Sequence, residues 1–271
     1  MKLQQRIIMI AALAFLVLLG ACAPQATREP AVEAPAVTLD RQSLVALMHQ
    51  YLAALAQNDP SAVPFAENVK FVENTANIPV GDGLWATAVG GPGEFLIMAA
   101  DPTAQQVACL VMMKENRNAD VLLGARIKVE NGMITEAEHL AVRDMDFTTP
   151  MGKSQLNNLQ RPRPALLEDI TPEERTPYDQ MVRIGLSYYD ALLGEDGTLS
   201  PFAPDCERRE NGMTTAGTRE TIGAPPGSDE ATTKAMMAFP RTCAEQISTG
   251  TFAYITDIKS RRVPVVDEQN G

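Results

Sequence analysis

Positive charge and histidine are scarce in this chain of 271 residues. Lys and Arg number 23 against 34 Asp and Glu, which gives a formal net charge of -11 at pH 7. We therefore expect no nucleic-acid partner and no face held against anionic lipid, because both need clustered Lys and Arg. Only two histidines are present, His49 and His139, and no third ligand accompanies them. The sequence accordingly predicts neither a metal site nor another cofactor.

The apolar run at the start of the chain is too short to cross a bilayer comfortably. It covers residues 7–19 after a basic start and is followed by Gly20 and Ala21. A basic start, a short apolar stretch and small residues at the cut are typical of a secretory signal. Residues 1–21 are thus expected to be a signal peptide.

A cysteine follows these small residues directly, so that Leu19-Gly20-Ala21-Cys22 resembles the lipobox of bacterial lipoproteins. The resemblance implies that Cys22 is lipidated, becomes the mature N-terminus and anchors the protein in the cell envelope. In a Gram-negative cell the protein would face the periplasm from the outer membrane. Residues 22–40 contain three prolines without a helical or strand period, which indicates a tether or else an irregular arm packed on the first domain.

The rest of the chain contains an internal repeat. An apolar fraction of 45% and a charged fraction of 21% are typical of a folded protein. A shift of 137 positions aligns residues 51–74 with residues 188–211 without a gap, and nine of the 24 pairs are identical. Two copies of one domain are therefore predicted, at residues 41–147 and 176–271, with a proline-rich linker at residues 148–175 between them.

Each copy is expected to begin with an amphipathic helix of about 15 residues. In the second copy Thr176 is the expected N-cap, with Pro177 at the first helical position. The helices end at turn residues, Asn58-Asp59-Pro60 in the first copy and residues 194–197 in the second, and a short strand carrying Glu-Asn follows. Further strands of the first copy are expected over residues 94–98, 106–114, 121–129 and 134–143, with a hairpin turn at Asn131-Gly132. This order of elements predicts an α+β fold.

The second copy is expected to be incomplete. The turn that matches Asn131-Gly132 is Asn270-Gly271, where the sequence stops, so that a strand pattern near residues 262–267 has no successor. Either the chain is a fragment of a longer reading frame, or a strand from the linker, the tether or a second molecule fills the gap. The last alternative would give a homodimer.

The element order resembles the nuclear transport factor 2-like superfamily, whose members include SnoaL-like cyclases, ketosteroid isomerase and scytalone dehydratase. Two strings, Arg208-Arg209-Glu210-Asn211-Gly212 and residues 261–268, resemble an uncharacterised SnoaL-like domain family of bacterial and fungal proteins. The resemblance implies that each copy is a cone, in which helices pack on a curved antiparallel sheet around an apolar pocket. The catalytic residues of the enzymatic members have no placed counterpart in this sequence, so no reaction carries over.

Several residues are candidates for a pocket or for catalysis. Glu73-Asn74 and Glu210-Asn211 occupy equivalent positions in the two copies. Such a pair would orient a polar ligand group at the mouth of a cone, or else each Glu pairs with an arginine such as Arg126 or Arg262 while Asn bonds a turn. Trp85, the only tryptophan, follows a glycine-rich turn and forms either a pocket wall or part of the core.

Strict alternation along residues 134–142 predicts that Glu136 and Glu138 share a face with Ile134, Leu140 and Val142. A carboxylate on an apolar wall has a raised pKa and can act as a general acid or base, a role that Glu138 would take. The same alternation places His139 on the opposite face. Together with His49 it is expected at the surface or rim.

The cysteines are expected to have different roles. Cys109 and Cys243 each precede a strand pattern by 12 residues and are predicted to be equivalent, whereas Cys206 has Val69 as its counterpart. In an oxidising compartment this predicts a disulfide between Cys206 and Cys243 and leaves Cys109 as a buried free thiol.

The leading functional hypothesis is that the anchored protein binds a small, mostly apolar molecule in a cone pocket. One alternative is a cofactor-independent lyase, isomerase or hydratase that uses Glu73 or Glu138 as acid or base. A third is an assembly module whose sheet faces pair without any ligand. An open cone with an unpaired carboxylate favours the enzyme, an open apolar cone favours binding, and a filled cone favours assembly.

Overall fold

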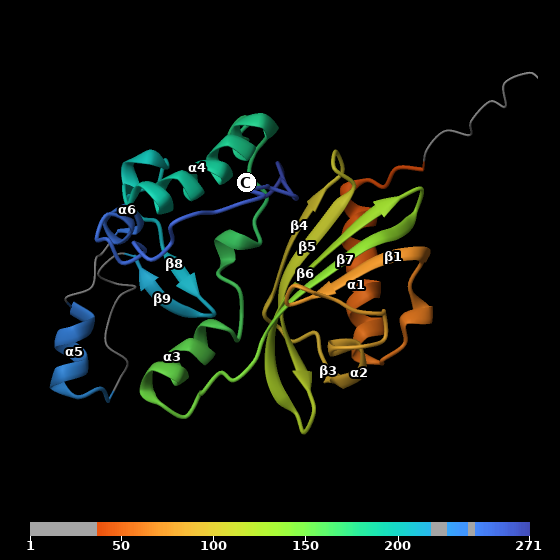
Figure 1. Ribbon diagram of the computed structural model, residues 1–271, viewed down its shortest axis with the longest axis horizontal. Helices are drawn as coiled ribbons and strands as arrows, with labels where there is room; N and C mark the ends of the chain where they lie inside the picture. The colour runs from red at the N-terminus through yellow and green to blue at the C-terminus, as the bar shows by residue number, and fades with distance from the viewer. Residues whose placement is uncertain (1–36, 218–226, 238–241) are drawn as a thin grey trace, which may run out of the picture. The chain divides into compact units, whose positions relative to one another are not determined.

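The computed structural model describes residues 37–217, 227–237 and 242–271. The expected signal peptide, Cys22 and residues 22–36 of the expected tether lie outside the described residues. All described residues belong to one compact unit, Ala36–Gly271. Helices and a curled, largely antiparallel sheet make up an α+β fold, as the sequence predicts (Figure 1).

The first helix, α1 (Arg41–Ala56), supplies the inner layer of the first span, which we define as residues 37–147. Asp40 caps its start, because the Asp40 carboxylate accepts a hydrogen bond of 2.7 Å from the Ser43 N–H. Apolar residues recur every three or four positions, so that one face of the helix is buried. The fully buried members of this face are Leu44, Met48, Tyr51, Leu52 and Leu55.

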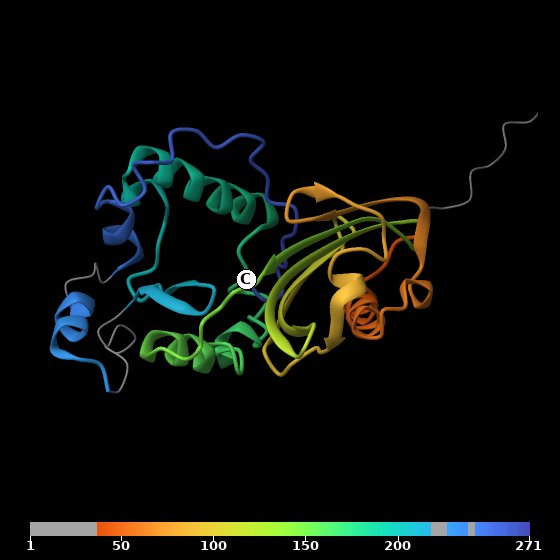
Figure 2. The same ribbon diagram turned by 60° about the horizontal axis from the view of Figure 1, so that its bottom comes forward.

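A seven-stranded sheet curls around α1 (Figure 2). The strand order is β2-β1-β7-β6-β5-β3, with β4 also paired to β5, and β1 runs parallel to β7 while the other pairs are antiparallel. The strands are β1 (Phe65–Glu73), β2 (Ala76–Asn77), β3 (Ala88–Gly90), β4 (Leu96–Asp101), β5 (Gln106–Glu115), β6 (Ala119–Glu130) and β7 (Met133–Val142). The strands expected over residues 94–98, 106–114, 121–129 and 134–143 correspond to β4, β5, β6 and β7 within a few residues, and the expected hairpin turn joins β6 to β7.

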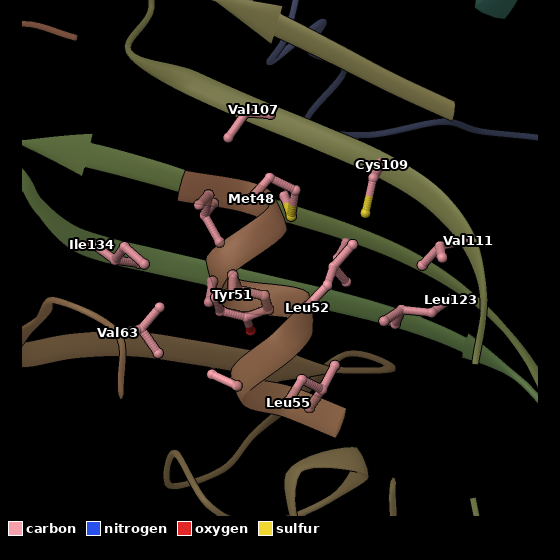
Figure 3. Packing of buried hydrophobic residues seen from close by; sticks show 14 of the residues in the cluster. Met48, Tyr51, Leu52, Leu55, Val63, Val107, Cys109, Val111, Leu123 and Ile134 are labelled. Atoms are coloured by element: carbon pink, nitrogen blue, oxygen red, sulfur yellow. The ribbon is translucent and has the colours of Figure 1, made fainter. Parts of the chain in front are cut away.

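The main hydrophobic core lies between α1 and the concave face of the sheet. Figure 3 shows Val107, Cys109 and Val111 of β5 directed toward α1. A short helix, α2 (Leu84–Thr87), contributes Leu84 and Trp85, which are 0% and 1% exposed. Each large apolar side chain buried in this way contributes roughly 1.5–3 kcal/mol. Packed side chains therefore fill the interior of the cone.

Strand β7 departs from the expected strict alternation. Its register with β6 shifts after Ile134, where the irregularity of a β-bulge inverts the two faces of the rest of the strand. Ile134 and His139 are consequently both 0% exposed in the core, while Leu140 is 57% exposed on the outer face. The expected surface position of His139 is wrong for this reason. Glu136 and Glu138 share the outer face with Leu140 and Val142, as predicted, but not with Ile134.

The second span, residues 176–271, repeats only the first elements of the first span. Its sheet among the described residues is the hairpin of β8 (Arg208–Glu210) and β9 (Met213–Ala216). Helix α4 (Tyr178–Gly194) begins one residue later than predicted, since its N-cap is Pro177 and not Thr176, and no side chain caps it. The remaining elements are η3 (Gly197–Leu199), α5 (Glu230–Met237) and α6 (Cys243–Ile247).

Equivalent contacts confirm the repeat at its spacing of 137 residues. Asp59 caps Ser61 in η1 (Pro60–Ala62) at 3.0 Å, and Asp196 caps Thr198 at 2.9 Å. The ring centroids of Tyr51 and Phe65 lie 6.0 Å apart, and those of Tyr188 and Phe202 lie 6.1 Å apart. In the register of the two hairpins, Glu73 lies opposite Ala76 on the neighbouring strand, and Glu210 lies opposite Met213.

The segment between the spans and the C-terminal segment (residues 258–271) differ from the prediction. The former holds the helices α3 (Pro150–Asn158) and η2 (Pro164–Leu166). The strand expected near residues 262–267 is absent there, and this stretch runs back to the first span without regular structure.

Two buried carboxylates fasten the C-terminal segment to the first span. Asp267 forms an ion pair of 2.9 Å with Arg41 and accepts a hydrogen bond of 2.9 Å from the Ala100 N–H. Asp101, 0% exposed, accepts hydrogen bonds of 2.9 Å from the Val266 N–H and from the Tyr178 hydroxyl. We call Asp101 and Asp267 the carboxylate clasp.

Candidate functional site

The residues that the sequence singles out fall in three separate places. The core of the first span and its border contain Glu73, Asn74 and Trp85. The outer face of the sheet brings together Arg126, Glu138 and Arg262. The β8-β9 hairpin contains Glu210 and Asn211. The sequence thus identifies three neighbourhoods and does not identify one assembled site.

Glu73 is the centre of a buried polar network. Its carboxylate accepts a hydrogen bond of 2.9 Å from the Leu84 N–H, forms an ion pair of 3.1 Å with Arg143 and lies 3.4 Å from His139 Nδ1. Burial opposes ionisation of this carboxyl, but hydrogen bonds from His139, Leu84 and Arg143 outweigh burial and lower its pKa to about 2. Arg143 also pairs with Glu115 at 2.7 Å.

His139 connects this network to α1. Its Nε2 lies 2.8 Å from the Tyr51 hydroxyl, and the ring is 0% exposed. Burial lowers the pKa of His139 against the opposing effect of the Glu73 carboxylate, and burial raises the pKa of Tyr51. A Tyr-His-Glu series of this kind can pass a proton along its hydrogen bonds. None of the three cavities described below is lined by Tyr51, His139 or Glu73, so we interpret the network as a stabilising element of the core.

Asn74 and Trp85 are also structural. The Asn74 side chain donates to the Ala141 carbonyl at 3.0 Å and accepts from the Ala141 N–H at 2.9 Å, which extends the pairing of β1 with β7. Trp85 packs edge-on against Tyr51, with ring centroids 5.2 Å apart. Of the two interpretations of Trp85, the core residue is confirmed.

The two repeated glutamates occupy matching places, and each contacts an arginine of its own span. Glu73 pairs with Arg143, and Glu210 pairs with Arg208. The specific partners suggested by the sequence, Arg126 and Arg262, are engaged elsewhere.

Arg126 forms the base of a charged cluster on the outer face. Its guanidinium donates to Glu138 and to Glu136 at 3.0 Å each and to the Gln106 side chain at 2.6 Å. Arg262 of the C-terminal segment reaches the same Glu138 at 3.2 Å. Residues that are 136 positions apart in sequence are therefore joined through one carboxylate.

Two cavities meet at this cluster. The outer cavity, of about 600 Å³, lies between the outer face of β4–β7 and the C-terminal segment, and its lining includes Ala99, Ala108, Gly124, Leu140, Pro264 and Val265. The polar cavity, of about 370 Å³, is lined by residues that include Lys70, Thr75, Asn77 and Glu136. Both cavities are lined by Arg126, Glu138 and Arg262.

A third cavity, of about 500 Å³, contains the repeated Glu-Asn pair of the second span. Glu210 and Asn211 line it opposite apolar residues of the first sheet such as Phe95 and Leu122. Arg163, Glu207 and Arg209 add charge, and Arg209 and Glu207 form an ion pair. The two arginines and two glutamates that line this cavity therefore balance in charge.

The cysteines behave as predicted, although one reason for the prediction is wrong. Cys206 and Cys243 form a disulfide with Cα atoms 5.9 Å apart, and Cys109 is a buried free thiol whose pKa burial raises to about 12. Cys109 belongs to strand β5 and Cys243 to helix α6, so the two are not structural equivalents. His49 is exposed, as expected.

Sequence reasoning missed Arg143, the partner of Glu73, and Lys70 in the polar cavity. Neither belongs to a motif, and only the pairing of β1 beside β7 brings them into place. Among the described residues no helix is long and apolar enough to cross a membrane, and no group of His, Cys, Asp and Glu in that part of the chain has the arrangement of a metal site.

Comparison with known proteins gives a family without an assigned activity. A family model described as "Domain of unknown function (DUF8021)" matches residues 38–141 and 174–271, more than half of the chain, in two tandem spans. The sequence matches no curated protein.

Solved structures resemble only part of the chain. A protein from Sphaerobacter thermophilus is 15% identical with a TM-score of 0.30, covering 37% of this chain and 96% of its own. A protein of unknown function with a cystatin-like fold from Methylobium petroleophilum PM1 is 14% identical with a TM-score of 0.32, covering 42% and 84%. A de novo designed protein with a curved β-sheet is 12% identical with a TM-score of 0.30, covering 41% and 92%.

Proposed function

This chain belongs to the family of the domain of unknown function DUF8021, and we propose that it binds a small, mostly apolar molecule in the outer cavity. The proposal includes lipidation at Cys22 and attachment to the cell envelope, for which the support is the string Leu19-Gly20-Ala21-Cys22. It also includes membership of the nuclear transport factor 2-like superfamily, for which the support is a helix held in the concave face of a curled sheet.

The interior of the cone does not offer room for the ligand. Tyr51, Phe71 and Trp85 are at most 2% exposed there, and the polar network around Glu73 has partners within the core. A filled cone argues against a ligand or a reaction in its interior, so the hypothesis of a cone pocket does not hold for the first span, and by the criterion stated above it favours an assembly module. The outer cavity is the observation that favours binding instead, on the outer face of the sheet.

The observation that carries the proposal is the construction of the outer cavity. Small residues on neighbouring strands, Ala99, Ala108 and Gly124, form a shallow floor, while Leu140 stands 57% exposed beside it. Pro264 and Val265 of the C-terminal segment lie across this floor. A concave, mainly apolar site of several hundred Å³ with a few polar groups is typical of small-molecule binding.

Filling the floor tests the proposal. Gly124 has no strained φ, and a Cβ there would meet Leu140 only at an ordinary 3.7 Å, so that Gly124→Leu places its side chain in the cavity without backbone strain. We expect the full chain carrying Cys22→Ser to enhance the fluorescence of the neutral probe N-phenyl-1-naphthylamine. Gly124→Leu should weaken this binding at least tenfold.

Gly90→Leu is the matched control. A Cβ at Gly90 meets Lys114 at 3.7 Å, so the steric change is comparable, but Gly90 does not line the outer cavity. This variant should bind the probe like the parent. Equal affinity for the probe in Gly124→Leu and the parent would overturn the site, and no binding of the probe by the parent would overturn the proposal itself.

A further inference from the structure

We infer that the ligand is an amphiphilic anion, with its apolar part in the outer cavity and a head group of one negative charge in the neighbouring polar cavity. This inference rests on the proposed function and adds the chemical class of the ligand. Its basis is the juxtaposition of two cavities of opposite character at one charged cluster.

The two cavities are immediate neighbours on the outer face of the sheet. Arg126, Glu138 and Arg262 line both of them. On one side of these shared residues lie Ala108 and Leu140, with Lys259 and Arg261 neutralised by ion pairs to Asp257 and Asp190. On the other side lie the polar side chains of Thr75 and Asn77. A molecule that occupies both sides must therefore be apolar at one end and polar at the other.

The charge of the polar cavity selects the sign of the head group. Three cations, Lys70, Arg126 and Arg262, line it together with two carboxylates, Glu136 and Glu138. One positive charge is left over, in a chain whose formal net charge is -11. A surplus of one cation matches a head group with one negative charge better than a neutral or multiply charged one.

The cations have distinct parts in this arrangement. The Arg126 side chain is 10% exposed and its donors are directed to Glu136, Glu138 and Gln106, so it positions the carboxylates. The Arg262 side chain is 59% exposed and makes one ion pair, with Glu138. Lys70 is exposed and has no ion pair with any of the described residues. Lys70 and Arg262 therefore remain able to donate to an anion.

Matched ligands test this assignment in the full chain carrying Cys22→Ser. Decanoate and decanol have the same apolar chain and differ in the charge of the head, and displacement of N-phenyl-1-naphthylamine measures the affinity of each. Decanoate should bind about tenfold more tightly than decanol at low salt, and the preference should shrink as the ionic strength rises. Lys70→Gln and Arg262→Gln should each reduce this preference about threefold, with the affinity for decanol unchanged.

Lys153→Gln is the matched control, since Lys153 is an exposed lysine of α3 that lines neither cavity. It should leave the preference intact. Equal binding of decanoate and decanol by the parent would overturn the inference while the proposed function stands. Absence of probe binding by the parent would instead overturn the proposed function, and a preference unaffected by Lys70→Gln and Arg262→Gln would move the head group away from the polar cavity.

Discussion

At the scale of single residues, His139 links burial and charge most closely. Its ring lies between the Tyr51 hydroxyl and the Glu73 carboxylate and is 0% exposed. Burial disfavours the imidazolium and lowers the pKa of His139, while the partners of Glu73 lower the pKa of that carboxyl to about 2. Both groups therefore bind protons more readily in the unfolded chain than in the folded one.

The free energy of unfolding should fall as the pH is lowered. The unfolded chain takes up a proton at His139 below about pH 6.5 and at Glu73 below about pH 4.5, before the folded protein does. Both contributions are present above these values and are lost in turn as the pH drops toward 2. Urea unfolding between pH 4 and pH 8 measures the slope.

The second histidine provides the control for this prediction. His49→Gln changes an exposed residue and should leave the slope between pH 5 and pH 7 as it is, whereas His139→Gln should flatten it at the cost of some stability. If the free energy of unfolding depended on pH equally in His139→Gln and in the parent, a group other than His139 would be responsible for that dependence.

At the scale of elements, hydrophobic alternation was enough to find the strands but not their faces. The strands of the β5-β6-β7 meander follow from runs of apolar residues and from the Asn131-Gly132 turn. The irregular register near Ile134 leaves no mark in the sequence pattern, and it decides that His139 points inward and Glu138 outward. The error about the face on which His139 lies thus arose from one irregular position.

The proline-rich composition of the segment between the spans predicted a linker and did not indicate the helices α3 and η2. The expected linker is rich in proline, yet Pro150 stands at the start of α3, where its missing N–H costs nothing. Thr149 caps this helix by accepting a hydrogen bond of 3.0 Å from the Gly152 N–H. Threonine directly before proline is a helix-start signal that the composition of the segment concealed.

The disulfide should be a main source of stability for the elements of the second span. The bonded cysteines are 37 residues apart in sequence, and closing a loop of this length restricts the unfolded chain by about 3–4 kcal/mol in the chain-entropy model. The double variant Cys206→Ser with Cys243→Ser should therefore unfold at lower urea concentration.

Sensitivity to reductant distinguishes this effect from a general loss of packing. Dithiothreitol should shift the unfolding midpoint of the parent toward that of the double variant, and it should not affect the double variant. An unchanged midpoint for the reduced parent would contradict the prediction.

At the scale of the whole molecule, the candidate site depends on residues that no local pattern connects. Gly124 and Pro264 line one cavity although they are 140 positions apart, and neither carries a chemical motif. The sequence singled out Arg126, Glu138 and Arg262 individually, but it suggested the two arginines as partners for the repeated glutamates. Their convergence requires the C-terminal segment to lie on the first span, which the repeat alone does not imply.

Lipidation at Cys22 remains a prediction about the molecule in its cell. Metabolic labelling with a clickable fatty acid should mark the parent, and Cys22→Ser should lose the signal, because the thiol is the acceptor in the lipobox resemblance. Cys109→Ala, which removes a buried thiol, should keep the label. Equal labelling of the parent and Cys22→Ser would refute the anchor.

The carboxylate clasp has a consequence for the order in which the protein matures during synthesis. The sheet of the first span is complete at Val142, but the Val266 N–H that bonds Asp101 belongs to a residue made 165 positions later than its acceptor. Because chains emerge with the N-terminal part first, the nascent first span can bond Asp101 to the nearby Ala104 N–H, but the bond from the Val266 N–H forms only once that later segment has been released. In the same way, the ion pair of Arg41 forms only after Asp267 has been made. The C-terminal segment therefore completes the first span only after all the residues between them have been made.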